Sequence, residues 1–158
     1  NKGDKTNFLR RAIDKIKQRC EIEVASSIYE TKALGNLNQE NFLNAVIRMK
    51  TDFSLLELFN FLKSIEKELD RSKTEKWGDR EIDLDILFYN ELVYSDEIIT
   101  VPHKGIPKRD FVLIPLCEIN SELIHPELKQ KICDITVPDS EKCVIRKLPE
   151  KLLVNDIE

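Results

Sequence analysis

The stretch Lys76-Trp77-Gly78-Asp79-Arg80-Glu81-Ile82-Asp83-Leu84-Asp85-Ile86-Leu87-Phe88 places a basic, aromatic-bearing loop directly before an alternating segment. Asp83 and Asp85 are separated by one residue, and in an extended strand residues i and i+2 point to the same face. The alternation therefore predicts a strand with both carboxylates side by side on one face. Ile82, Leu84 and Ile86 then point to the opposite, buried face.

Two neighbouring carboxylates repel each other unless a cation lies between them. Mg²⁺ meets that need, because it takes oxygen ligands and is commonly shared with substrate phosphates. Lys76 and Arg80, just upstream, are suited to the phosphate oxygens that remain. This stretch alone indicates a nucleotide-dependent transferase of phosphoryl-type groups.

Length and composition predict one globular domain. The chain has 158 residues, of which 41% are hydrophobic and 34% charged, which is typical of a soluble domain with a sizeable core. It contains no run of 18 apolar residues and no apolar region near Asn1, so we expect no membrane partner, no signal peptide and a cytoplasmic protein. The net charge of −4 argues against a nucleic-acid partner.

The cysteines predict no metal or redox chemistry. Cys20, Cys117, Cys133 and Cys143 show no CxxC spacing, so we expect reduced thiols.

The hydrophobic pattern predicts the order helix, strand, strand, helix, strand and short helix. Thr6 is the expected N-cap of the first helix, and Ser54 with Glu57 forms a capping box for the second. The expected ranges are helices over 6–19, from 54 onward and about 108–118, and strands over 21–30, 42–49 and 82–88. This order lacks the leading strand of a ferredoxin-like arrangement, so we expect the given chain to begin partway through the natural one.

Several segments together resemble the family of 6-hydroxymethyl-7,8-dihydropterin pyrophosphokinases of the folate pathway. The likeness spans roughly residues 1–126, and the Arg-x-x-Asp-x-Asp element is its most specific part. The segments that carry it are Asn1 to Asp4, Phe42-Leu-Asn44-Ala, Ile65-Glu66, Arg71, Lys76 to Leu87, Val101-Pro-His103 and Arg109-x-Phe111-Val-Leu-x-Pro-Leu-x-Glu118-Ile.

The resemblance implies a ferredoxin-like α+β fold, an antiparallel sheet with helices packed on it, whose N-terminal strand is missing from the given chain. It implies transfer of the β,γ-pyrophosphoryl group of ATP to 6-hydroxymethyl-7,8-dihydropterin, giving AMP and the pterin diphosphate, with two Mg²⁺ ions. We assign 1–147 to the pyrophosphokinase domain and 148–158 to a C-terminal tail or linker. Fusion to another folate-pathway enzyme is conceivable, since the activity occurs in such fusions.

The resemblance also implies roles for individual residues. Catalytic roles fall to Arg71 and Arg80, and metal binding to Asp83 and Asp85. ATP binding falls to Glu66, Lys73, Lys76, Ile86, Thr100, His103, Lys104 and Arg109. Pterin binding falls to Thr31, Leu34, Phe42, Asn44, Trp77 and Phe111.

Physical reasoning supports these roles from the residues themselves. The chain has neither a Walker A loop nor a GxGxxG turn, so side-chain cations must neutralise the phosphates. A flat pterin requires aromatic faces and an amide partner, although Phe42 and Phe111 alone would be assigned to the core. His125 is expected to be structural.

Two other classes remain open. A metal-dependent nuclease can use a D-x-D pair with basic neighbours, but the acidic net charge opposes it. A non-catalytic ferredoxin-like binding domain is the second alternative.

Overall fold

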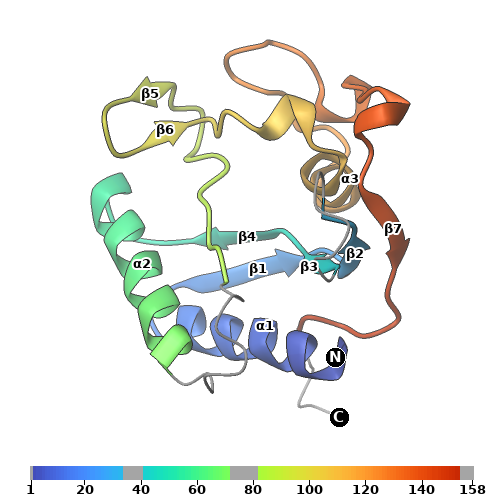
Figure 1. Cartoon of the computed structure of the whole chain (residues 1–158). Coiled ribbons are helices and arrows are strands. Elements are labelled where there is room, and N and C mark those ends of the chain that lie inside the picture. The colour runs from blue at the N-terminus through green and yellow to red at the C-terminus, as the bar shows by residue number, and fades with distance from the viewer. Residues whose placement is uncertain (1, 34–40, 72–81, 154–158) are drawn as a thin grey trace.

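The structure, a computed structural model, describes residues 2–33, 41–71 and 82–153. Figure 1 shows helices on both sides of a central pair of antiparallel strands, β1 and β4, with α1 on one side and α3 on the other. This arrangement confirms the predicted α+β class. The helices are α1 (Lys2–Lys17), α2 (Leu55–Arg71) and α3 (Asp110–Ile119), and the strands are β1 (Glu21–Ala25), β2 (Tyr29–Thr31), β3 (Phe42–Asn44), β4 (Ile47–Lys50), β5 (Tyr94–Ser95), β6 (Thr100–Val101) and β7 (Val144–Lys147).

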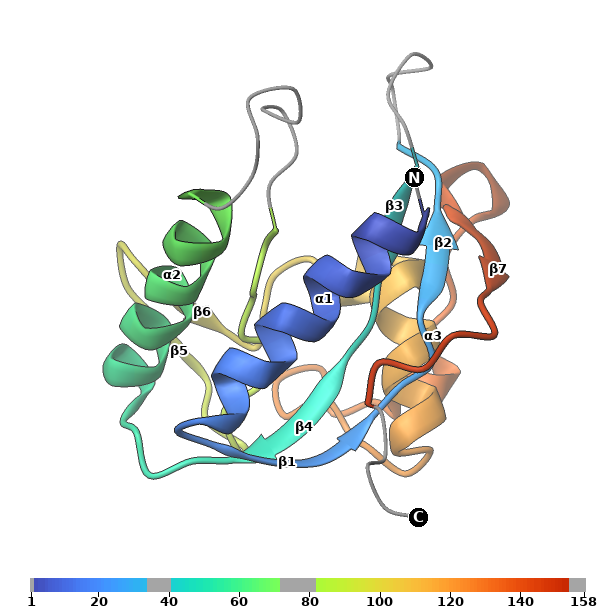
Figure 2. The ribbon, with the colours of Figure 1, turned by 90° about the horizontal axis from the view of Figure 1, so that it is seen from below.

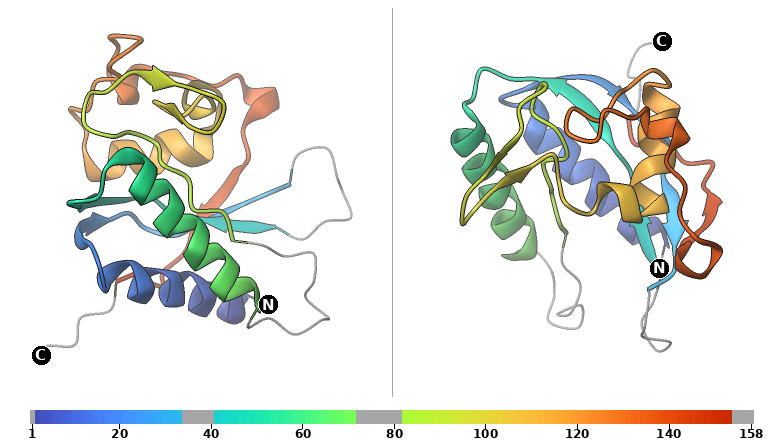
Figure 3. Two further views of the ribbon diagram at one scale, coloured as in Figure 1. Left: turned by 90° about the vertical axis from the view of Figure 1, so that its left-hand side faces the viewer. Right: turned by 90° about the horizontal axis from the view of Figure 1, so that it is seen from above.

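Within the described residues the strands form three small antiparallel sheets. The orders are β1–β4, β3–β2–β7 and β5–β6. The β5–β6 hairpin, yellow-green to yellow in the left-hand view of Figure 3, lies on the side of β1–β4 away from α1.

The two strands expected over 21–30 and 42–49 are each interrupted once. At the break Ser26 N–H donates to the Val46 carbonyl oxygen at 2.8 Å, and Val46 N–H donates to Ser26 Oγ at 2.9 Å. Because the Ser26 hydroxyl replaces a main-chain acceptor, the regular ladder stops there. The break divides the long hairpin into the β1–β4 pair and the β2–β3 pair.

Helix α2 begins where the capping box places it. Ser54 N–H donates to Glu57 Oε1 at 2.9 Å, and Glu57 N–H donates to Ser54 Oγ at 3.2 Å. The N-cap predicted at Thr6 is wrong, because α1 begins at Lys2 and Thr6 is buried inside it.

The first hydrophobic cluster joins α1 to α2, whose packing is seen from below in Figure 2. The buried members of the cluster are Ala12, Ile16, Cys20, Leu58, Leu62, Ile65, Leu69 and Ile82.

The helices within the described residues lack the length and apolar content that crossing a lipid bilayer requires.

Residues 82–88 form no strand and pair with no strand of the described part of the chain, which differs from the strand expected there. Residues of this segment and of β4 line one large cavity instead of meeting in a ladder. The expected alternation of faces is nevertheless present. Ile82 is buried, Leu84 and Ile86 pack against the first cluster, and Asp83 and Asp85 are exposed.

The C-terminal part of the chain packs back onto the rest of the protein. Leu148 and Leu152 are buried together with Ile13 of α1 and Ile28 beside β2. The Leu148 N–H also donates to the Ile28 carbonyl oxygen at 2.8 Å.

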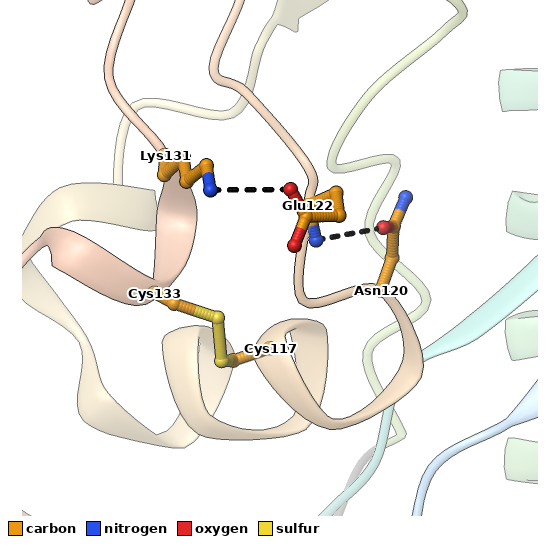
Figure 4. Close-up of a disulfide and its surroundings, with 5 residues drawn as sticks. All are labelled: Cys117, Asn120, Glu122, Lys131 and Cys133. Carbon is orange, nitrogen blue, oxygen red and sulfur yellow. Dashed lines mark hydrogen bonds and ion pairs between the residues drawn. A yellow bond between two sulfur atoms is a disulfide. The ribbon is translucent and has the colours of Figure 1, made fainter.

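The prediction of reduced thiols is wrong for two of the four cysteines. Cys117 of α3 and Cys133 form a disulfide, with their Cα atoms 5.3 Å apart (Figure 4). The intervening loop is also held by Lys131, whose Nζ lies 3.1 Å from Glu122 Oε1. The two cysteines are 16 residues apart, and only the tertiary fold brings them together. Cys20 and Cys143 are free and buried.

His125 has the structural role that the sequence indicates. Its Nδ1 accepts hydrogen bonds from the N–H groups of Glu127 at 3.2 Å and Leu128 at 3.0 Å, and its ring meets the edge of Phe88. Burial lowers the pKa of the His125 imidazole, although the Glu127 carboxylate opposes this shift. The folded protein therefore favours the neutral ring.

We expect His125→Asn to make the protein less sensitive to acid. A lowered pKa in the folded state gives stability that is complete above the unfolded pKa of about 6.5 and is lost as the pH falls through the folded value. Asparagine keeps an acceptor for the two N–H groups but does not titrate. Urea unfolding at pH 7.5 and pH 5 should show a smaller loss of stability in the variant, and an equal loss in both proteins would contradict this assignment.

Candidate active site

Most of the described candidate residues surround one cavity of about 1620 Å³. Its walls come from α1, the β2–β3 hairpin, β4, residues 82–90 and the beginning of α3. Of the candidate site residues, those that line it are Thr31, Phe42, Asn44, Asp83, Asp85, Ile86, His103, Arg109 and Phe111.

The two carboxylates of the segment 82–88 are both exposed at this cavity. The main chain between them is held by Glu66 of α2, whose Oε2 accepts the Leu84 N–H at 2.6 Å. Glu66 Oε1 in turn lies 3.1 Å from Lys63 Nζ. The sequence assigned Glu66 to ATP binding. In the structure Glu66 lines neither this cavity nor a second, smaller one, and its carboxylate fixes the segment that carries the aspartates.

His103 faces the second of these carboxylates. Its Nδ1 accepts the Gly105 N–H at 3.0 Å, so the ring proton of the neutral imidazole is on Nε2. That atom lies 3.7 Å from Asp85 Oδ2. The main chain adds a second tie, because His103 N–H donates to the Leu87 carbonyl oxygen at 2.9 Å.

Arg109 lies beside an aromatic ring of the cavity. It is exposed just before α3, and its guanidinium carbon lies 5.7 Å from the centre of the Phe111 ring. A Cβ at Gly105 would stand 2.7 Å from Arg109 Nε, so the glycine gives this side chain room to pass. The arginine therefore has one face on an aromatic ring and fork-shaped donors available to an anion.

The β2–β3 hairpin supplies the candidate pterin residues. Thr31 pairs with Phe42, and Asn44 pairs with Tyr29. Asn44 Nδ2 donates to the buried Thr31 Oγ1 at 2.8 Å, so the amide orientation is fixed. Among the described residues, the hairpin thus presents an aromatic ring and an oriented amide to the cavity that also holds Phe111.

Glu118 of α3 anchors this hairpin, a role that the sequence analysis did not assign. Its carboxylate accepts hydrogen bonds from Ser27 N–H, Ser27 Oγ at 2.7 Å and Tyr29 OH at 2.9 Å. Burial alone would raise the pKa of Glu118, but these bonds and the charge of Lys147 lower it on balance. Burial and the bond to Glu118 raise the pKa of Tyr29 to about 12.

Three of the candidate ATP residues line a second cavity, of about 500 Å³. Thr100 and Lys104 lie there, and His103 lines both cavities. Thr100 Oγ1 is 2.9 Å from Ser95 Oγ across the β5–β6 hairpin. The structure therefore does not bring Thr100 and Lys104 onto the large cavity.

Several predicted residues cannot be placed. Leu34, Lys73, Lys76, Trp77 and Arg80 lie outside the described residues, and of Arg71 only the main chain, at the end of α2, is described.

The aspartate pair is chemically suited to Mg²⁺. Among the described residues no group of three or more His, Cys, Asp or Glu side chains gathers as a protein-only metal site. Mg²⁺ is usually held by one or two carboxylates and completes its shell with water and substrate phosphates. Asp83 and Asp85 could supply that share.

Comparison with known proteins gives a consistent result. Residues 1–121 match the family model described as 7,8-dihydro-6-hydroxymethylpterin-pyrophosphokinase. A protein of Aquifex aeolicus named 2-amino-4-hydroxy-6-hydroxymethyldihydropteridine pyrophosphokinase is 41% identical over 150 residues, which cover 94% of each chain. A Bacillus subtilis protein of the same name is 40% identical over 121 residues, covering 75% of this chain and 72% of that one. The "Bifunctional protein FolKE" of Lactococcus lactis is 33% identical over 162 residues, and the match spans 46% of its length.

Proposed function

Since this chain belongs to the 7,8-dihydro-6-hydroxymethylpterin-pyrophosphokinase family, we propose that it transfers the β,γ-pyrophosphoryl group of ATP to 6-hydroxymethyl-7,8-dihydropterin in folate biosynthesis. The products are AMP and the pterin diphosphate. One observation carries the assignment to this site. A single cavity is lined both by a charged and polar set, Asp83, Asp85, His103 and Arg109, and by an aromatic and amide set, Phe42, Asn44 and Phe111.

The chemistry requires the two substrates to meet in that cavity. The pterin hydroxyl oxygen attacks the β-phosphorus, the bond from that phosphorus to the α,β-bridging oxygen breaks, and AMP leaves with the electron pair. The hydroxyl proton passes to solvent. Phosphoryl-type transfer asks the protein mainly for positioning and for neutralisation of charge, which are the two tasks that the residues of the cavity can perform.

We propose that Asp83 and Asp85 hold Mg²⁺, two ions in the full complex. When bound, the metal would neutralise phosphate charge and orient the triphosphate. The protein's own contribution is to hold both carboxylates on one exposed side of the segment. Glu66 supports this position through the Leu84 N–H, and His103 directs an N–H toward Asp85.

The remaining cations act on the ATP phosphates in this proposal. Arg109 lies on the large cavity with its guanidinium beside Phe111. Arg71 and Arg80 are assigned to the charge that builds on the transferred group, because guanidinium forks match phosphate oxygens. Supporting ATP contacts are assigned to Glu66, Lys73, Lys76, Ile86, Thr100, His103 and Lys104.

Pterin recognition is assigned to the hairpin and the start of α3. Phe42 and Phe111 offer aromatic faces, and Asn44 offers an amide whose orientation Thr31 fixes. Leu34 and Trp77 are assigned by family resemblance. A cytoplasmic location and a fused second enzyme, like that suggested by the name of the Lactococcus lactis relative, remain predictions for this chain.

The direct test is a product analysis with ATP, Mg²⁺ and 6-hydroxymethyl-7,8-dihydropterin. We expect AMP to form only when the pterin is present, in equal amount with the pterin diphosphate. Formation of ADP, or of AMP without pterin dependence, would reject the pyrophosphokinase assignment. Cleavage of DNA or RNA would support the nuclease alternative instead.

A further inference from the structure

Strand β7 lies beyond the residues that match the family model, yet it completes the sheet that carries the candidate pterin residues. The family match ends at residue 121, and β7 spans Val144–Lys147. It pairs antiparallel with β2 on the edge opposite β3, in the register Glu30 to Arg146 and Thr31 to Val144. Figure 1 shows β7 reaching β2 from the C-terminal part of the chain.

One buried carboxylate connects β7 to both strands of the hairpin. The Glu30 side chain is 9% exposed, and its Oε1 accepts a hydrogen bond from Arg146 Nε at 2.8 Å. Its Oε2 accepts a second bond from Asn41 Nδ2 at 3.0 Å. A carboxylate that is nine-tenths buried stays charged at low cost only when such partners are present.

Glu30 and one of its two partners, Asn41, are sequence neighbours of the pterin candidates. Glu30 precedes Thr31, Asn41 precedes Phe42, and Thr31 and Phe42 are themselves paired across the hairpin. A shift of the Glu30 and Asn41 side chains would therefore displace the adjoining Thr31 and Phe42, which are proposed contacts to the pterin.

Strand β7 is also bound to the start of α3, which carries the candidate pterin residue Phe111. Asp110, next to Phe111 at the start of α3, accepts the N–H groups of Cys143 and Val144 at 2.9 Å each. On the other side, the Lys32 N–H donates to the Cys143 carbonyl oxygen at 3.0 Å. The strand thus connects β2, β3 and α3, which carry Thr31, Phe42 and Phe111.

We propose that Arg146 is a positioning residue for the pterin substrate, acting through Glu30 and Asn41 on the β2–β3 hairpin. This inference rests on the proposed function. Arg146 does not line the large cavity, so it acts by fixing the hairpin and not by touching the ligand. Asp83, Asp85 and His103, which are proposed to bind Mg²⁺ and ATP, lie on other segments of the chain. Loss of the Arg146 contact should therefore affect pterin binding and not ATP binding.

The test compares Arg146→Met, which keeps the aliphatic stem but removes the guanidinium, with the wild type. We expect KM for the pterin to rise about fivefold or more, because small misplacement of a binding surface weakens capture of a rigid ligand. The KM for ATP and kcat should stay within about twofold. Arg146→Lys, which keeps the charge, should recover part of the pterin affinity.

Lys15→Met is the matched control. Lys15 also makes an ion pair between two elements, with its Nζ 2.7 Å from Glu68 Oε2, but this pair joins α1 to α2 and neither residue lines either cavity. We expect its pterin KM to equal that of the wild type. Melting temperatures of all three variants show whether a change reflects unfolding.

The possible results separate the two claims. A wild-type enzyme that forms no pterin-dependent AMP would overturn the proposed function and this inference together. Normal wild-type turnover with an unchanged pterin KM in Arg146→Met would overturn the inference alone. An equal rise in the pterin and ATP KM values, or the same rise in Lys15→Met, would also overturn it.

Discussion

Replacing Asp83 or Asp85 by asparagine should lower kcat about a thousandfold or more, since a carboxylate that holds a catalytic metal contributes several kcal/mol to the transition state. Both side chains are exposed at the cavity, so neither substitution leaves a buried charge unpaired. The folded structure should therefore survive while the chemistry fails. AMP formation at saturating ATP, Mg²⁺ and pterin measures the loss.

Asp134→Asn is the matched control, because Asp134 is exposed and lies on neither cavity. Its kcat should be unchanged. EDTA should abolish turnover of the wild type, and excess Mg²⁺ should restore it. A kcat near the wild-type value in either aspartate variant would refute the metal assignment.

Asp110→Ala should cause the largest loss of stability among single polar substitutions in the C-terminal part of the described chain. Asp110 is 6% exposed, and its carboxylate accepts the N–H of Cys143 through both oxygens and the N–H of Val144. Removing it leaves two N–H groups at the entrance to β7 without their acceptor. We expect the free energy of unfolding to fall by about 2–4 kcal/mol.

Chemical denaturation and melting curves measure this loss, and the melting temperature should drop by about 5–15 °C. Asp139→Ala serves as the control, because the Asp139 side chain is 96% exposed and pairs with Lys142 at the surface. Its effect should be below about 0.5 kcal/mol. Equal melting temperatures for Asp110→Ala and Asp139→Ala would show that Asp110 does not hold β7.

Local sequence signals were reliable where the cause of the structure is local. The capping box of Ser54 and Glu57 forms as predicted, because all of its partners lie within four residues. The alternation that separates Asp83 and Asp85 from Ile82 depends only on extended backbone geometry.

Predictions failed where distant segments decide the outcome. The breaks in the two long strands depend on a hydroxyl of Ser26 meeting Val46, and no pattern within either strand shows this contact. The disulfide between Cys117 and Cys133 needs the loop after α3 to fold back, which spacing alone does not predict. Residues 82–88 have the pattern of a strand, but pairing requires a neighbour that the pattern does not specify.

The candidate site shows the same division. Motif residues such as Asp83, His103 and Arg109 could be named from the sequence, and the structure gathers these three around one cavity. The residues that hold these three side chains, or hold the β2–β3 hairpin, were not predictable. Arg146 reaches Glu30 across 116 positions of sequence, and Glu118 reaches Ser27 across 91.

The most direct test of the central claim is a crystal structure with a non-hydrolysable ATP analogue, Mg²⁺ and 6-hydroxymethyl-7,8-dihydropterin. The account predicts oxygens of Asp83 and Asp85 at about 2.1 Å from Mg²⁺, with the pterin ring between Phe42 and Phe111. A metal held only by phosphates, or a triphosphate bound away from residues 82–88, would contradict it.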